Sequence, residues 1–500
     1  MSTIIANFSI SFIVFFEFLL FTSTLSAQQI EVNIKINPVS PQIIDIEGGF
    51  LQENQTNSNK NWAFLNSFTG VENLGERVSD LSLKNKQGKN VSVRKLAAGE
   101  YLADDAVNAW SYRIDANPPQ NANAIAHVSW LAPEQGILVL GDLLPQFETI
   151  GNQKISARIK FELPKDWKII STEKKTAENN FAVENVEKAI FLVGKNWREK
   201  EISIGKGKLN FVISGNWQFS DAEAHETAAD IFARYGQLFG EIPGEQIQIS
   251  LVRFPKDVTF GRWEAETRGF NLTVLSSDMP FKTLSLQRLY EQLRHELFHL
   301  WIPNNLALTG NYDWFYEGFA VYQALRTGVE MNQIRFEDFL DTLSQAYNLD
   351  NLQTRKVSLI ESSKNRWSGA GNPQVYSRGM IAAFLCDAAL LRASRGKRSV
   401  SDILKEIYQK YRAPNEPRDG NTAILNALEQ HKELNSIVEK YIKGVGRVDW
   451  DADLESVGIE ANEENSFTHL KVKAKPNRRQ KDLLNRLGYN NWRKGSEKAE

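Results

Sequence analysis

The sequence predicts a multidomain α+β chain, in which a β-sandwich-like N-terminal domain precedes a mainly helical domain with a small mixed sheet. Two observations support this division. Residues 29–215 contain many short runs of alternating or β-branched residues, separated by Gly, Asn, Pro and charged turns. After Ser285 the apolar residues recur at helical spacing to about Gly444. The composition, 42% hydrophobic and 24% charged, is typical of a folded globular chain.

The N-terminus predicts a chain that leaves the cytoplasm. Residues 4–27 are strongly apolar, and the sequence turns polar at Gln28. We expect residues 1–27 to be a signal peptide cleaved after Ser26 or Ala27. An uncleaved anchor is the alternative, because the stretch lacks a basic start and is long enough to span a membrane. The mature protein is then extracytoplasmic: periplasmic, secreted, or tethered to the membrane by this segment.

The first folded unit is predicted at residues 28–215. Its strand-like runs include "IEVNIKINP", "WSYRIDA", "GILVLGD" and "KISARIKFEL". Short strands at such regular spacing are typical of a β-sandwich. Trp110 and Trp130 lie within strand patterns and are expected in the core.

The second unit is predicted at residues 216–444. Ser220 is a suitable N-cap for the helical stretch that follows it. Strands are expected at 246–254 and 270–276, and helices at 284–302, 313–327, 336–347, 376–393, 400–411 and 423–430. Cys386 lies in an apolar helical run and is expected to be a buried packing residue. Residues 445–500 are charged and weakly patterned, which predicts a small C-terminal appendage or a tail.

The charge balance excludes nucleic acid as a partner. The chain has 59 basic and 61 acidic residues and a net charge of −2. No basic excess is available to attract a phosphate backbone or an anionic membrane surface. We expect membrane contact only if residues 4–27 remain as an anchor.

The stretch "YEQLRHELFHLWIP" contains the strongest chemical signal. His295 and His299 lie four residues apart and therefore share one face of a helix, close enough to bind one metal ion. Glu296 follows the first histidine, which is the HExxH arrangement of metallopeptidases with the glutamate as general base. The alternative is a polar helix face that packs against Trp301 or Tyr290.

Two later residues complete a predicted site. Glu317 lies in "NYDWFYEGFAVYQALRTG", where Asp313 is a suitable N-cap and Gly328 a suitable helix end. With 17 residues between His299 and Glu317, one loop can bring the second helix back to the first. Glu317 would be the third ligand of one zinc ion per chain and leave a position open for water. Tyr376 is a candidate phenol donor for the oxyanion.

These segments resemble the gluzincin metallopeptidases, and most closely the aminopeptidase N-like and glycyl aminopeptidase families. "HELFHLW", "WFYEGFAVY" and "VYSRGMIAAFL" are similar to the zinc helix, the ligand helix and the catalytic tyrosine segment of those enzymes. The resemblance covers roughly residues 31–459. It implies a thermolysin-like catalytic domain with zinc bound by His295, His299 and Glu317, and with Glu296 and Tyr376 in catalysis.

The sequence also departs from these families. The gap before Glu317 is one residue shorter than is usual in the aminopeptidase N-like family, and the "GxMEN" segment that holds a substrate's amino terminus is absent. The corresponding region is "FGRWEAETRGFNLTVL", where Glu264 and Glu266 are acidic residues without an assigned role. The sequence therefore leaves exopeptidase and endopeptidase activity open.

The resulting hypothesis is an extracytoplasmic zinc peptidase that hydrolyses peptide or protein substrates through a zinc-bound water activated by Glu296, with aminopeptidase activity as one option. The strand at 270–276 is expected to offer an edge to an extended peptide. A non-catalytic binding or scaffold protein on a peptidase fold is the alternative. A third hypothesis is that the β-rich region is an adhesion module, but no specific motif supports it.

Overall fold

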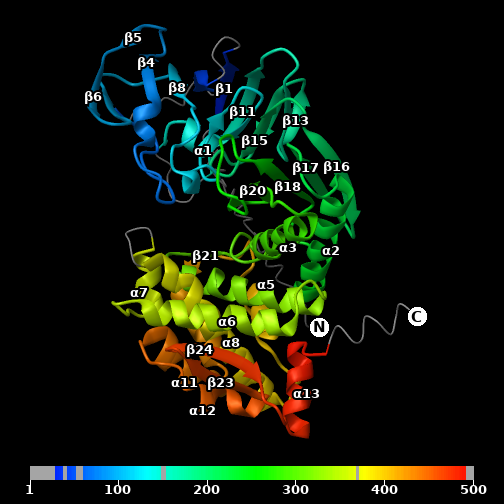
Figure 1. Cartoon of the computed structure of the whole chain (residues 1–500). Coiled ribbons are helices and arrows are strands. Elements are labelled where there is room, and N and C mark those ends of the chain that lie inside the picture. Colours follow the sequence, from blue (N-terminus) through cyan, green and yellow to red (C-terminus); the bar gives the residue numbers. More distant parts are fainter. Residues whose placement is uncertain (1–28, 38–41, 52–59, 148–153, 367–370, 491–500) are drawn as a thin grey trace, which may run out of the picture.

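The computed structural model describes residues 29–37, 42–51, 60–147, 154–366 and 371–490 of the 500-residue chain. The strands of the N-terminal half lie above a helical half, with the chain running from blue to red in Figure 1. The predicted α+β class is confirmed, whereas the signal or anchor predicted at residues 1–27 lies outside the described residues. Among the described residues, no helix is long and apolar enough to cross a membrane.

A large sheet forms the outer layer of the N-terminal half, in the order β13-β14-β11-β1-β2-β8-β4-β5. Strand β1 pairs in parallel with β11 and antiparallel with β2. Its residues alternate between buried and more exposed positions, so one face of the sheet covers the core. The strands are β1 (Gln29–Ile36), β2 (Ile43–Phe50), β4 (Val78–Lys84), β5 (Asn90–Val91), β8 (Ala109–Asp115), β11 (Ser156–Glu162), β13 (Lys174–Ala177) and β14 (Asn180–Val183).

A smaller sheet forms a middle layer. It consists of β12 (Lys168–Ile170), β15 (Ile190–Gly194), β10 (Gln135–Val139) and β9 (Trp130–Leu131). In β10, Leu138 joins the core under the large sheet, while Ile137 and Val139 join a second core on the opposite face. Both predicted core tryptophans, Trp110 and Trp130, are buried.

Short elements close this half of the molecule. They are the small sheet β3 (Asn61–Ala63), β7 (Glu100–Ala103) and β6 (Val93–Ala97), together with η1 (Leu74–Arg77), η2 (Ala122–Ala124) and α1 (Leu140–Leu143).

The third layer is the predicted mixed sheet, in the order β16-β17-β18-β20-β19. Its strands are β16 (Arg198–Ile204), β17 (Gly207–Ile213), β18 (Gln246–Arg253), β19 (Trp263–Arg268) and β20 (Asn271–Ser276). The expectation that residues 270–276 form an edge is wrong, because β20 lies between β18 and β19. The edge strand is β19, which turns back onto β20 at Gly269 with a φ of 56°.

Two helices cover the inner face of the mixed sheet (Figure 1). Helix α2 (Asp221–Phe239) begins at the predicted N-cap Ser220, whose hydroxyl accepts from the Glu223 amide in a capping box. It ends at Gly240, which adopts the left-handed conformation that glycine tolerates. Helix α3 (Lys282–Phe298) contributes both histidines of the predicted site.

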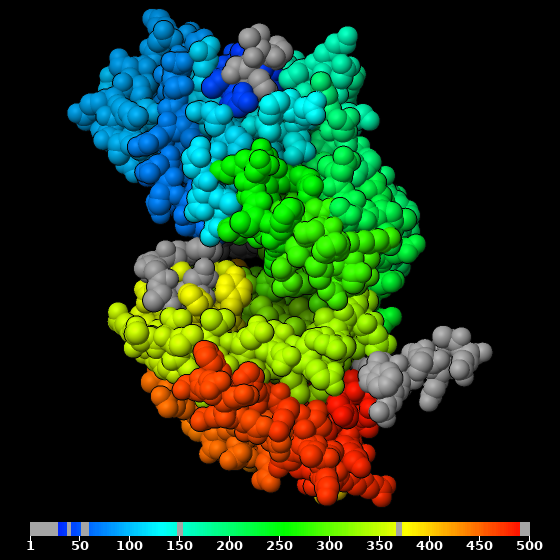
Figure 2. All heavy atoms as spheres, in the orientation of Figure 1, coloured from blue at the N-terminus to red at the C-terminus, as the bar shows by residue number. Residues whose placement is uncertain are grey.

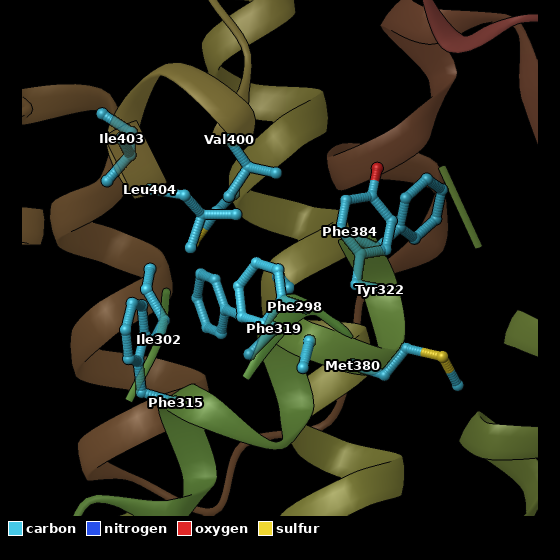
Figure 3. Close-up of a cluster of buried hydrophobic side chains, with 14 of the residues drawn as sticks. Phe298, Ile302, Phe315, Phe319, Tyr322, Met380, Phe384, Val400, Ile403 and Leu404 are labelled. Carbon is cyan, nitrogen blue, oxygen red and sulfur yellow. The ribbon is translucent and has the colours of Figure 1, made fainter. Parts of the chain in front are cut away.

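The remaining helices form one aromatic-rich core around α3. They are α4 (Asp313–Tyr316), α5 (Gly318–Glu330), α6 (Phe336–Leu352), α7 (Leu359–Lys364), α8 (Gly371–Ser394), α9 (Val400–Tyr411) and α10 (Gly420–Glu429). Figure 3 shows Phe298, Phe319 and Phe384 gathered between these helices. Cys386 is fully buried in α8, as predicted.

Five of the six predicted helices have different bounds in the structure. The helix expected at 336–347 continues to Leu352, and the one expected at 423–430 covers Gly420–Glu429. The helix expected at 284–302 ends at Phe298, and the one expected at 313–327 is interrupted at Glu317 and continues to Glu330. Gly328 does not end that helix. Instead it makes room for Arg294, since a Cβ on Gly328 would lie 3.0 Å from the Arg294 Cζ. The helix of Tyr376 begins at Gly371, so the tyrosine lies in its second turn.

The described part of residues 445–500 is folded. It comprises α12 (Trp450–Leu454), η5 (Glu455–Val457), the hairpin β23 (Ile459–Glu464) and β24 (Phe467–Val472), and α13 (Arg478–Leu487). The Leu470 amide donates to the Ser344 hydroxyl of α6, and Leu483 and Leu487 belong to the helical core. This segment is thus an appendage docked on the helical half, while residues 491–500 lie outside the described residues.

Short elements complete the helical half. Strands β21 (Leu308–Thr309) and β22 (Arg418–Asp419) pair in parallel with each other. The elements η3 (Lys432–Leu434), α11 (Asn435–Ile437) and η4 (Val438–Lys443) lead from α10 toward the appendage. The predicted boundaries between domains remain predictions.

Candidate active site

The two histidines lie at the end of α3. Past Phe298 the α-helix gives way to a tighter 3-10-type turn, because the His299 amide donates to the carbonyl of Glu296, three residues earlier. The histidine side chains still converge, with their Nε2 atoms 3.2 Å apart. The Nδ1 of His299 lies 3.0 Å from the Ile302 carbonyl, which fixes the ring and leaves Nε2 directed at its neighbour.

Glu317 brings a carboxylate to the same point. It is the residue between α4 and α5, and its side chain is buried. Its Oε2 lies 3.4 Å from the His295 Nε2 and 3.5 Å from the His299 Nε2. One ligand atom from each of His295, His299 and Glu317 falls within 4.8 Å of the others.

This trio suits a divalent cation such as zinc. Two imidazoles and one carboxylate are the donor set of open, catalytic zinc sites. The Oε2 of Glu317 is buried without a hydrogen bond of normal geometry, so it is available to a cation. Burial alone would lower the pKa of His299, but the Glu317 carboxylate outweighs it and raises that pKa to about 9. The pocket therefore stabilises positive charge.

Glu296 lies beside the trio on the wall of a cavity. Its side chain is buried, and Oε2 accepts a hydrogen bond of 3.3 Å from the Thr267 hydroxyl of β19. Its Oε1 lies 3.9 Å from the His295 Nε2. Burial raises the pKa of Glu296 above its usual value, which makes the carboxylate a better proton acceptor.

Tyr376 reaches the site through an arginine. The Arg366 Nη2 donates to the Tyr376 hydroxyl at 2.7 Å and to the Glu317 Oε1 at 3.0 Å. Its Nη1 donates to the Asp313 carboxylate at 2.7 Å. Burial opposes the ionised form of Glu317, yet Arg366 and His299 hold the pKa of that carboxyl well below its usual range. Arg366 thereby links the expected ligand Glu317 to the expected catalytic Tyr376.

A cavity of about 570 Å³ opens beside these residues. Figure 2 shows the surface hollowed between the green sheet region and the yellow-green helices. The edge strand β19 supplies one wall, with Glu264 and Glu266 among the lining residues. Glu266 already contacts His127 at 2.5 Å and Arg268 at 3.3 Å, and Glu264 pairs with Arg262 at 2.8 Å.

Several functional candidates were missed by sequence reasoning. Thr267 lies in "WEAETR", a polar stretch that gives no strand signal, and Arg366 lies between two motifs with no spacing that connects it to either. His127 comes from the N-terminal half, far away in sequence. Only the fold brings these residues to the cavity.

The fold is that of the M1 zinc metallopeptidases, which confirms at the level of the fold the resemblance inferred from the site motifs. The similarity extends to an aminopeptidase N family protein from Idiomarina loihiensis, with a TM-score of 0.74 and 16% sequence identity. The matched region covers 87% of this chain and 79% of that one.

A second similar structure is an M1 zinc metallopeptidase variant from Deinococcus radiodurans bound to a Tyr-Ser-Ala substrate. It has a TM-score of 0.54 and 13% identity, and the match covers 84% of this chain and 94% of that one. No family model matches the sequence, and no curated protein sequence matches it.

Proposed function

We propose that the protein is a zinc-dependent peptidase that hydrolyses peptide bonds, with His295, His299 and Glu317 as its zinc ligands. The observation that carries the proposal is the convergence of these ligand atoms with Glu296 and Tyr376 on one cavity. Zinc, when bound there, polarises a substrate carbonyl and lowers the pKa of a water molecule.

Glu296 is the proposed general base. It takes a proton from the attacking water and passes it to the leaving amine. The Thr267 hydroxyl orients the carboxylate by donating to its Oε2. The raised pKa supports this role, because a buried glutamate accepts a proton more readily than an exposed one.

Tyr376 is the proposed oxyanion stabiliser. The oxygen of its hydroxyl accepts a hydrogen bond from Arg366, so its own proton can be donated to a substrate oxygen in the cavity. Burial and the neighbouring Glu317 raise the pKa of the phenol, so it stays protonated and able to donate. A donor placed where charge develops stabilises the transition state more than the ground state.

The proposed substrates are peptides, and the family resemblance adds aminopeptidase activity to the proposal. The cavity lies beside β19, and an edge strand suits an extended peptide. Peptide libraries with free or acetylated amino termini, read by mass spectrometry of the products, distinguish release of single N-terminal residues from internal cleavage.

We also propose that the protein works outside the cytoplasm. The apolar stretch at residues 4–27 supports this location. Cell fractionation with N-terminal sequencing tests it: a mature N-terminus near Gln28 indicates cleavage, an intact chain in the membrane fraction indicates an anchor, and a cytosolic chain contradicts the proposal.

The deciding experiment compares the purified wild-type chain with Glu296→Gln. We expect about one zinc per chain in both proteins and hydrolysis only in the wild type, because the substitution removes the base but no ligand. Glu416→Gln, at an exposed position outside the cavity, is the matched control. Wild-type protein that takes up no zinc contradicts the proposal. Zinc uptake without cleavage of any library peptide supports the non-catalytic alternative.

A further inference from the structure

The cavity has a second wall, formed by α3, α5 and α6. The lining residues on this wall are Glu291, Arg294, Val321, Ala324, Leu325 and Thr342. Most of them are apolar or short, so a charged group on this wall lies in surroundings that screen it poorly. Of the two charged residues on this wall, Glu291 is exposed and pairs with Arg288, whereas Arg294 is buried and needs an explanation.

Most charged groups around the cavity have a partner of opposite charge. Glu264 pairs with Arg262, Glu266 with Arg268, Glu291 with Arg288, and Glu317 with Arg366. Among the charged lining residues, Arg294 is the one to which the described part of the chain gives no ion pair within 4.0 Å.

Arg294 is also held firmly in place. It is only 3% exposed, and its Nη1 donates to the Gln333 side-chain oxygen at 2.6 Å. Its Nε is buried and finds no hydrogen-bond acceptor within the described ranges. The guanidinium lies against Gly328, where a Cβ would come within 3.0 Å of both Cζ and Nε. The fold thus leaves space for this side chain and fixes its orientation.

An enclosed cation without a counter-charge is unfavourable unless something supplies the missing anion. A guanidinium donates several hydrogen bonds in a fixed plane and binds carboxylates especially well. Because the cavity also holds the proposed reaction centre, a peptide placed there would bring its own carboxylates to Arg294.

We propose that Arg294 is a specificity-determining residue that binds a carboxylate of the peptide, either its C-terminal carboxylate or an acidic side chain. This proposal rests on the proposed function, since it takes the ligand to be a peptide. The enzyme would then favour short peptides with a free C-terminus in the first case, and acidic sequences in the second.

The test measures peptide binding by calorimetry to the zinc-loaded full chain carrying Glu296→Gln, so that no turnover is needed. One arm compares trialanine with trialanine amide. The other arm compares acetylated tetra-alanine amides that carry one Asp or one Asn at each position in turn. We expect the carboxylate form to bind about tenfold or more tightly in one arm, which identifies the source of the carboxylate. Equal dissociation constants in both arms, or no binding of any peptide, overturn the proposal.

Variants assign the preference to Arg294. Arg294→Gln should bring the two dissociation constants within about twofold of each other, and Gln333→Glu should do the same by neutralising the guanidinium without altering α3. The matched controls are Arg113→Gln and Gln430→Glu, which make the same charge changes at exposed positions outside the cavity. A carboxylate preference that survives Gln333→Glu in folded, zinc-loaded protein overturns the assignment.

The two proposals fail separately. Zinc content and hydrolysis by the wild type report on the proposed function, whereas the binding pairs report on Arg294. Carboxylate-dependent binding without hydrolysis retains Arg294 as an anion site and rejects the peptidase. Hydrolysis with no carboxylate preference retains the peptidase and rejects Arg294 as a carboxylate-binding residue.

Discussion

Gly318 and Gly379 face each other where α5 crosses α8, so closely that a Cβ on Gly318 would lie 2.4 Å from the Gly379 Cα. Gly318 follows the expected ligand Glu317 directly, and Gly379 comes three residues after Tyr376. The contact between two residues without side chains therefore sets how closely these two site residues approach each other.

Gly379→Ala should separate the two helices. Its Cβ would meet the Gly318 Cα and the Trp314 carbonyl oxygen, both at 2.8 Å, and neither backbone atom can move alone. We expect a loss of about 1–3 kcal/mol in the free energy of unfolding and weaker zinc binding. Thermal unfolding and competition with a chromogenic chelator measure the two effects.

Gly236→Ala is the control for this prediction. Gly236 also lies inside a helix, but its added Cβ would meet only the flexible end of Ile242, at 3.3 Å. Alanine is a better helix former than glycine by about 0.8–1.0 kcal/mol, so this variant should be neutral or stabilised. Equal destabilisation of both variants would contradict the role of the close approach.

Arg366→Met should destabilise the protein strongly. Arg366 is buried and bridges Asp313 and Glu317, so its loss leaves two buried carboxylates without their cation. Breaking a buried ion pair from one side typically costs about 3–5 kcal/mol. Urea unfolding in the presence of a chelator measures the loss. Arg198→Met removes a partly exposed pair with Asp221 and should cost less than about 1 kcal/mol. If both variants lost a similar free energy of unfolding, the result would contradict a special contribution from the buried ion pairs of Arg366.

Tyr376→Phe should separate catalysis from metal binding. The substitution removes the proposed oxyanion donor but no member of the ligand trio. We expect kcat to fall by about 10²–10³-fold while KM and zinc content stay close to wild type. Tyr441→Phe, which removes a hydroxyl bonded to Asp453 away from the cavity, is the control. A loss of zinc in Tyr376→Phe would assign the residue a structural role instead.

The convergence of His295, His299 and Glu317 could be predicted from the sequence because its signals are local. Four-residue spacing on one helix and an acidic residue early on the next are readable without tertiary contacts. The helix at 400–411 was predicted with its observed bounds, and in the structure Ser399 and Asp402 form a capping box at its start. These features depend on neighbours within a few residues.

What could not be predicted depends on distant partners. The edge strand β19 consists largely of polar residues, and its strand conformation comes from pairing with β20. Glu317 interrupts its helix, although the pattern across 313–327 is continuous. Arg366 and Arg294 become functional candidates only through the residues that surround them in space, because neither belongs to a recognisable motif.

The stability of the N-terminal half should depend on pH through Glu173. Burial, followed by the charge of Glu184, raises the pKa of Glu173 to about 7 in the folded protein. Between pH values near 4.5 and 7 the folded protein retains a proton that the unfolded chain has lost, so stability falls as the pH rises through this window. Glu173→Gln removes the titrating group and with it this fall in stability. The variant should be more stable than the wild type by about 1–3 kcal/mol at pH 8, with little difference at pH 4.5. Thermal midpoints at both pH values test this, with the exposed Glu178→Gln as control, and an equal shift at both pH values would contradict it.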